Sequence, residues 1–141
     1  MTPALTLAWT AEVEIGEKQD LGNGPLGRCF IVPILGGTFA GPRLRGRVLA
    51  GGADRQLLRA DGVREFDALY EMQVDDGTVI TVRNRVLVEG DDPRTRYARS
   101  VVRAEVAVGP HAWITRRVLV GTLESLRPER PAVRVTVYVL D

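Results

Sequence analysis

The sequence predicts an all-β protein: a single-domain antiparallel β-barrel over residues 1–141, with about nine or ten strands and little helix. Three observations predict this fold. Apolar and polar side chains alternate with a period of two, residues typical of turns separate the alternating stretches, and no segment keeps a helical period for three turns. Closure into a barrel is the simplest way for so many strands to avoid exposed edges.

The elements follow from the pattern in chain order. In Leu5–Ile15 every second residue is apolar, with Thr and Glu between, as expected of a half-buried antiparallel strand. The apolar run Cys29–Leu35 and the short segment Arg55–Ala60 are also expected to be strands. Four further ranges show the same alternation and are expected to be strands: Ala68–Val74, Ile80–Val88, Val102–Val108 and Val133–Leu140.

The segments between the strands carry turn residues. Asp61-Gly62 and Asp76-Gly77 are typical of β-hairpin turns. The glycine pairs Gly36-Gly37 and Gly51-Gly52 lack the surroundings of a nucleotide-binding loop, so we interpret them as places where strands bend to close the barrel. Gly16–Gly27 has few apolar residues and is predicted to be a long loop with at most one helical turn.

Composition limits the partners. Nineteen basic against eighteen acidic residues give a net charge of +1, which argues against a nucleic-acid partner. The apolar runs are far shorter than a membrane span, and the start of the chain does not resemble a secretory signal. We therefore expect no membrane partner and a cytoplasmic location; a homodimer or higher homo-oligomer is a plausible assembly.

The reactive residue types are scarce. Cys29, Lys18 and His111 are the only cysteine, lysine and histidine. A disulfide, a thiolate metal cluster and a His-rich zinc site therefore cannot form within the chain, and Schiff-base chemistry has one poor candidate. No dinucleotide fingerprint is present. We expect neither a metal nor a cofactor.

Polar residues on the predicted interior faces are the candidate site. Asp54 follows three small residues near a predicted bulge and is the candidate general base. Tyr70 shares a face with Met72 and Val74, and we give it a catalytic role beside Asp54. An apolar cavity with a few convergent polar groups is how small-ligand sites are built.

Four further residues are predicted to bind the substrate: Arg59, Asn84, Trp113 and Thr115. Asn84 lies on the apolar side of its strand, and Trp113 and Thr115 share one face if their segment is extended. For Tyr70, Asn84 and Trp113 the competing interpretation is a core residue whose polar atom bonds to the backbone.

The chain resembles a known family over most of its length. The residues that carry the resemblance are Ile34–Asp54, Arg59–Gly62, Asp67–Tyr70, Asp75–Ile80, Tyr97-Ala98-Arg99, Trp113 and Val118–Gly121, in this order. Together they are similar to the domain of unknown function 3237 family, also called uncharacterised protein family 0311. The resemblance implies a β-barrel domain without an agreed general activity.

The chain departs from this family pattern in three places. Arg55 stands where the family favours an aromatic residue, Arg85 where it favours glycine, and Thr115 where it favours asparagine. A threonine hydroxyl can replace only part of the hydrogen bonding of an amide. If the asparagine holds a ligand in relatives, these departures from the family pattern predict a different substrate for this chain.

The sequence favours an enzyme without deciding the matter. Our first hypothesis is a small-molecule-binding barrel that acts as a cofactor-independent lyase, isomerase or cyclase on a small oxygenated metabolite by acid–base chemistry. The alternatives are a barrel that binds a small organic ligand without changing it, and a structural β protein that serves assembly.

Overall fold

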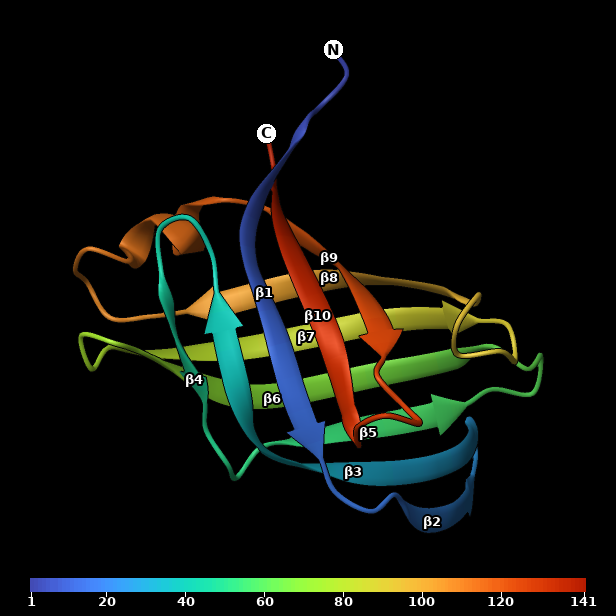
Figure 1. Ribbon diagram of the computed structural model, residues 1–141. Coiled ribbons are helices and arrows are strands. Elements are labelled where there is room, and N and C mark those ends of the chain that lie inside the picture. Colours follow the sequence, from blue (N-terminus) through green and yellow to red (C-terminus); the bar gives the residue numbers. More distant parts are fainter.

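Figure 1 shows the computed structural model, which describes all residues, Met1–Asp141. Strands account for 62% of the chain and helix for 4%, which confirms the predicted all-β class. The elements are β1 (Leu5–Ile15), β2 (Gln19–Gly24), β3 (Gly27–Ala40), β4 (Arg45–Val48), β5 (Ala53–Leu58), β6 (Arg64–Val74), β7 (Val79–Glu89), β8 (Tyr97–Glu105), the 3₁₀ helix η1 (Ala112–Arg116), β9 (Leu119–Ser125) and β10 (Ala132–Leu140).

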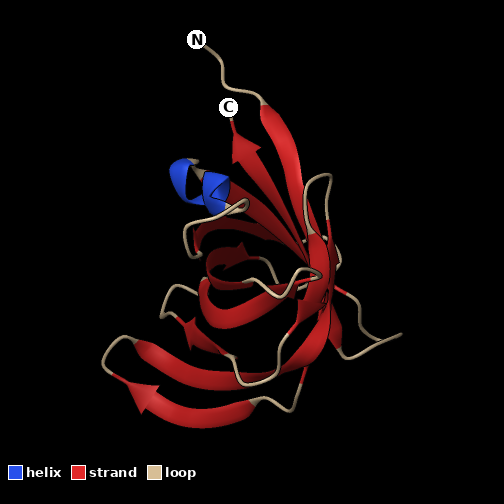
Figure 2. Ribbon diagram, turned by 90° about the vertical axis from the view of Figure 1, so that its left-hand side faces the viewer, coloured by secondary structure: helices blue, strands red, loops and turns tan.

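The strands form one closed antiparallel barrel of eight strands with two extra strands. Around the barrel, β1 pairs with β10, followed by β9, β8, β7 and β6. Both β4 and β5 lie between β6 and β3, and β3 pairs with β1 to close the circle. Figure 2 shows the curvature of these strands from the side, with η1 as the one helical segment.

The long strand β3 takes part in both ends of the barrel. Its first half, Arg28–Pro33, pairs with β5, and its last part, Gly37–Ala40, pairs with β4 and β1. Gly37 has a φ of 139°, and a Cβ at this position would collide with the carbonyl oxygen of Glu12 on β1. The close contact between β1 and β3 therefore needs glycine, which supports the predicted role of this pair in closure.

The interior is filled at one end and hollow at the other. Near η1, large apolar side chains pack tightly, with Trp9, Met72 and Ile114 almost wholly buried. Towards the end of β1 a smaller cluster, which includes Phe66 and Val86, borders open space. A barrel of this size can fill its interior with side chains or leave room for one small ligand, and this barrel is filled at one end and leaves a cavity at the other.

The prediction of a long loop over Gly16–Gly27 is wrong for the centre of this segment. Its centre forms β2, which pairs with β3 from Gln19 to Gly24. Five of the six residues of β2 are exposed, so none of its side chains had to be apolar. Backbone hydrogen bonds hold this strand, and a hydrophobic period cannot reveal it.

The segment around Trp113 also differs from the prediction. An extended segment would have placed Trp113 and Thr115 on one face, but residues Ala112–Arg116 form η1. The hydroxyl of Thr115 donates a hydrogen bond to the carbonyl oxygen of Ala112 at 2.7 Å, which supports the turn locally. The two side chains consequently point in different directions.

One contact ties the β6–β7 turn to the segment before η1. Asp76 Oδ2 lies 2.7 Å from His111 Nε2, and Asp76 Oδ1 accepts a hydrogen bond from the backbone N–H of Thr78 at 2.9 Å. The Thr78 N–H first, and then His111, lower the pKa of Asp76 from 3.8 to about 2. The carboxylate therefore stabilises the folded state above pH 3.8, and this stabilisation is lost as the pH falls towards 2.

We therefore expect Asp76→Asn to lose less stability than the wild type when the pH falls from 3.8 to about 2. Urea unfolding at a series of pH values measures this. Asp75→Asn is the matched control, since the carboxylate of Asp75 only approaches Arg45 at 4.0 Å. Parallel pH profiles for the wild type and Asp76→Asn would contradict the assignment.

Candidate functional site

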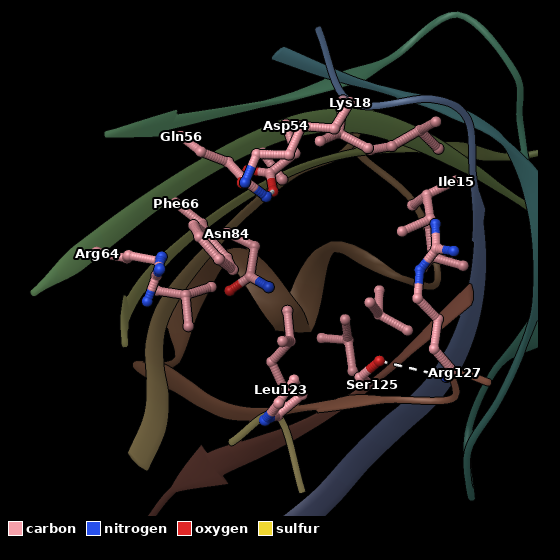
Figure 3. A pocket seen from close by; sticks show the side chains of 18 of the residues that line it. Ile15, Lys18, Asp54, Gln56, Arg64, Phe66, Asn84, Leu123, Ser125 and Arg127 are labelled. Carbon is pink, nitrogen blue, oxygen red and sulfur yellow. Dashed lines mark hydrogen bonds between the residues drawn. The ribbon is translucent and has the colours of Figure 1, made fainter. Parts of the chain in front are cut away.

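The hollow end of the barrel contains a cavity of about 340 Å³ (Figure 3). Side chains from β1, β3, β5, β6, β7, β9 and β10 line it, together with residues of the loops at this end. Its volume is at the lower end of the range for small-molecule pockets.

Two polar side chains lie in one row across neighbouring strands. Asp54 on β5 pairs with Ala68 on β6, and Ala68 pairs with Asn84 on β7. Paired residues of an antiparallel sheet point to the same face, so all three face the interior. Tyr70, two residues after Ala68, faces the same way. Because Ala68 carries only a methyl group, space remains between Asp54 and Asn84.

The Asp54 carboxylate is in an unusual environment. Gln56 Nε2 donates a hydrogen bond to Oδ2 at 2.8 Å, whereas Oδ1 is buried without a partner. Burial raises the pKa of Asp54 from 3.8 to about 6, and the Gln56 hydrogen bond offsets part of this effect. A carboxyl with such a pKa can gain and lose a proton near neutral pH.

Tyr70 and Asn84 are each 2% exposed, and the Tyr70 hydroxyl and Asn84 Oδ1 have no hydrogen-bond partner in the chain. The predicted alternative of core residues bonded to the backbone therefore does not describe these two atoms. Burial, and then the charge of Asp54, raise the pKa of the Tyr70 phenol. Tyr70 consequently stays protonated over the ordinary pH range and can donate a hydrogen bond.

The structure does not bring Arg59, Trp113 and Thr115 to this cavity. Arg59 follows the last residue of β5 and binds Asp61 at 2.5 Å and Glu65 at 3.0 Å in the hairpin turn. Its place beyond the strand end explains why it does not continue the interior face.

The other two residues lie on η1, at the filled end. Trp113 packs against the apolar core, with the guanidinium of Arg43 at 4.0 Å from its ring centroid. Thr115 is exposed. Of the six predicted site residues, the structure thus groups Asp54, Tyr70 and Asn84, and places the substrate-binding candidates Arg59, Trp113 and Thr115 elsewhere.

Comparison with known proteins identifies the family. The family model described as "Protein of unknown function (DUF3237)" matches residues 3–140. The chain belongs to the DUF3237 family. A UPF0311 protein of Rhodopseudomonas palustris is 33% identical to this DUF3237 chain, and the match covers 86% of the chain and 90% of the relative.

Solved structures with the same fold support the architecture of this DUF3237 protein. A β-barrel-like protein of Acinetobacter baumannii has a TM-score of 0.91 at 27% identity, covering 100% of this chain and 98% of the other. An enzyme from Penicillium herquei has a TM-score of 0.80 at 22% identity, covering 100% and 96%. The second likeness concerns the fold alone.

Several polar residues of the DUF3237 cavity were missed in the sequence. Gln56 and Arg64 continue the interior faces of Asp54 and Tyr70 by steps of two, so strand parity was a usable signal. The loop residues Lys18, Arg96 and Arg127 also line the cavity. They could not be predicted, because no sequence pattern shows which loops meet at one end of a barrel.

Nowhere in the chain do three or more His, Cys, Asp or Glu side chains lie together in a way that could hold a metal ion. No helix of this DUF3237 protein has the length and apolar character needed to cross a membrane.

Proposed function

We propose that this protein is a cofactor-independent lyase, isomerase or cyclase that transfers a proton on a small oxygenated molecule held in the cavity. The observation that carries the proposal is the group of unpartnered polar atoms at Asp54, Tyr70 and Asn84. Buried polar groups in folded proteins almost always have hydrogen-bond partners. Of the six such atoms in the chain, four belong to residues that line this cavity, Asp54, Tyr70, Asn84 and Arg96, and two, on Trp9 and Ser100, lie elsewhere. The concentration of four around one cavity supports a ligand that supplies the missing partners.

Asp54 acts as the base in this proposal. Its pKa of about 6 leaves it mainly ionised at neutral pH, yet more basic than an ordinary aspartate. Its Oδ1 has free lone pairs. The C–H bond next to a substrate carbonyl breaks, the proton moves to Oδ1, and the electron pair moves to the carbonyl oxygen to form an enolate.

Tyr70 stabilises the enolate by donating its O–H to the new oxyanion, and the Asn84 amide offers a further N–H. Asp54 then returns the proton. Return of the proton to a different carbon gives an isomer. Expulsion of a leaving group from the carbon next to the enolate, with the Asp54 proton passed to that group, gives an elimination. Attack of the enolate carbon on a second carbonyl of the same molecule, whose oxygen takes the Asp54 proton, gives a ring. The three reaction types share the first step, so the same residues serve each of them.

The test uses small-molecule extracts of the organism that carries the protein. We expect the wild type to deplete one compound and to form an isomer or elimination product, as seen by untargeted mass spectrometry. Asp54→Asn should form no product and should retain the substrate through purification. Tyr70→Phe should lower turnover about 100-fold, as the loss of one oxyanion donor does elsewhere.

The alternative is a barrel that binds without reaction. In that case wild type and Asp54→Asn would both retain the same compound unmodified, and no product would accumulate. This outcome would contradict an enzymatic role. Asp61→Asn is the matched control, since its carboxylate lies in an exposed turn and binds Arg59; it should leave turnover unchanged.

A further inference from the structure

The border of the cavity is rich in positive charge. Four cationic side chains line it: Lys18 before β2, Arg64 at the start of β6, Arg96 before β8 and Arg127 after β9. Figure 3 shows Lys18, Arg64 and Arg127 around the cavity on three sides. Residues far apart in the sequence thus bring their charges to one cavity.

These cations lack the carboxylate partners that other arginines have. Arg83, for example, binds Asp67 at 2.8 Å on the outer face of the barrel. In contrast, Lys18, Arg96 and Arg127 take part in no ion pair within the chain. The fourth, Arg64, only approaches the fully exposed carboxylate of Asp91 at 4.0 Å, a contact that contributes little.

Aromatic rings hold two of the cations in place without neutralising them. Lys18 Nζ lies 4.0 Å from the ring centroid of Phe30, and the Arg96 guanidinium lies 5.8 Å from that of Phe66. The Nε of Arg96 is buried and has no acceptor. A buried guanidinium N–H without an acceptor is costly, and an anionic ligand would satisfy it.

The cations also repel one another. Burial first, and then the charge of Arg64, lower the pKa of both Lys18 and Arg96. At Lys18 the carboxylates of Asp20 and then Asp54 offset part of the lowering of the pKa. The repulsion between these cations therefore destabilises the unliganded protein, and a bound anion would reduce this repulsion.

We infer that the cavity binds a small organic carboxylate, with its carboxylate on Arg64 and Arg96 and its apolar body against Phe66 and Leu123. Guanidinium groups hold planar carboxylates through paired hydrogen bonds. Only two acidic residues line the cavity, Asp54 and Asp91, so the four cations leave a net positive charge that favours an anionic ligand. The inference rests on the proposed function in assigning the ligand to this cavity, but binding does not require turnover.

The test compares 4-hydroxyphenylacetate with its uncharged amide, 4-hydroxyphenylacetamide, in NMR titrations of the ¹⁵N-labelled protein. The acid should bind about 10-fold more tightly than the amide, with shifts centred on β6 and the loop before β8. The Arg64→Gln/Arg96→Gln variant should lose this preference. Higher salt should weaken binding of the acid and leave the amide unchanged.

Two further variants separate a lost site from a damaged fold. Lys18→Gln/Arg127→Gln changes exposed residues and should weaken binding of the acid while the unfolding midpoint stays the same. Arg103→Gln, an exposed arginine of β8 that does not line the cavity, should bind the acid like the wild type. Equal binding of acid and amide, no binding of the acid, or an equal loss in Arg103→Gln would overturn the inference.

Inorganic phosphate and Asp54→Asn complete the design. Phosphate that binds at the same arginines more tightly than the acid would overturn the carboxylate assignment. Asp54→Asn should still bind the acid, because the arginines remain. A protein that binds the acid but never forms a product would therefore contradict the proposed chemistry and leave the carboxylate site intact.

Discussion

Asp54→Asn is expected to stabilise the folded protein by up to about 3 kcal/mol at neutral pH, and to abolish turnover. The pKa of Asp54 rises from 3.8 to about 6 on folding, and each unit corresponds to about 1.4 kcal/mol. The folded state therefore binds the Asp54 proton more tightly than the unfolded state. Asparagine removes the cost of the buried charge and keeps an oxygen that can accept the Gln56 hydrogen bond.

The stability difference between Asp54→Asn and the wild type should depend on pH. The Asp54 side chain is most favourable to folding below pH 3.8, where it is neutral in both states, and this advantage is lost as the pH rises through about 6. The stability gain of the variant should therefore be small at pH 3.8 and reach its full size above pH 6. Urea unfolding across this range measures it, and a gain that does not change with pH would contradict the buried charge.

Asp61→Asn is the control for this experiment. Its carboxylate binds Arg59 in an exposed turn, which lowers its pKa instead of raising it. The stability difference of this variant should change with pH in the opposite direction. A stabilising active-site substitution that removes activity is typical of a site that gives up stability for function.

Gly37→Ala is expected to destabilise the barrel by on the order of 3 kcal/mol, from backbone strain and overpacking together. The φ of 139° is unfavourable for alanine, and the new Cβ would collide with the Glu12 carbonyl across the β1–β3 pair. Because this pair closes the barrel, relief of the collision would separate the two strands. Urea unfolding followed by circular dichroism measures the loss.

Gly77→Ala isolates the contribution of strain. Gly77 has a φ of 93° in the β6–β7 turn, and nothing lies within 4 Å of a Cβ added there. We expect this variant to lose about 1 kcal/mol from strain alone. Equal losses in the two variants would show that the contact between β1 and β3 does not depend on a missing side chain.

Much of the fold could be predicted, because half-buried strands impose a period of two. In β7 every second residue from Ile80 to Val88 is buried, so the alternation read in the sequence is the alternation of the barrel wall. Strand β2 was not predicted because five of its six residues are exposed, so its sequence has no apolar period. The helix η1 was not predicted because a helix of five residues is too short to show a hydrophobic period.

The site was predictable to the extent that it lies on strands. Tyr70 and Asn84 were placed inside by strand parity, and Asp54 by the small residues and the predicted bulge before it. Trp113 and Thr115 were expected on an extended segment, which instead forms η1. The cationic border of the cavity depends on the topology of the barrel, because Lys18 and Arg127 are more than a hundred residues apart in the sequence and still line the same cavity. Only the closed barrel shows that these loops meet.

The division of the interior into a filled and a hollow end has a consequence for how the family can change. Strand β6 places Met72 in the filled end and Phe66 beside the cavity, so one strand serves both ends. Substitutions near Phe66 should alter the shape of the cavity, while the packing around Met72 continues to hold the barrel closed. The cavity can therefore change its shape, by natural drift or by directed evolution, without first rebuilding the scaffold.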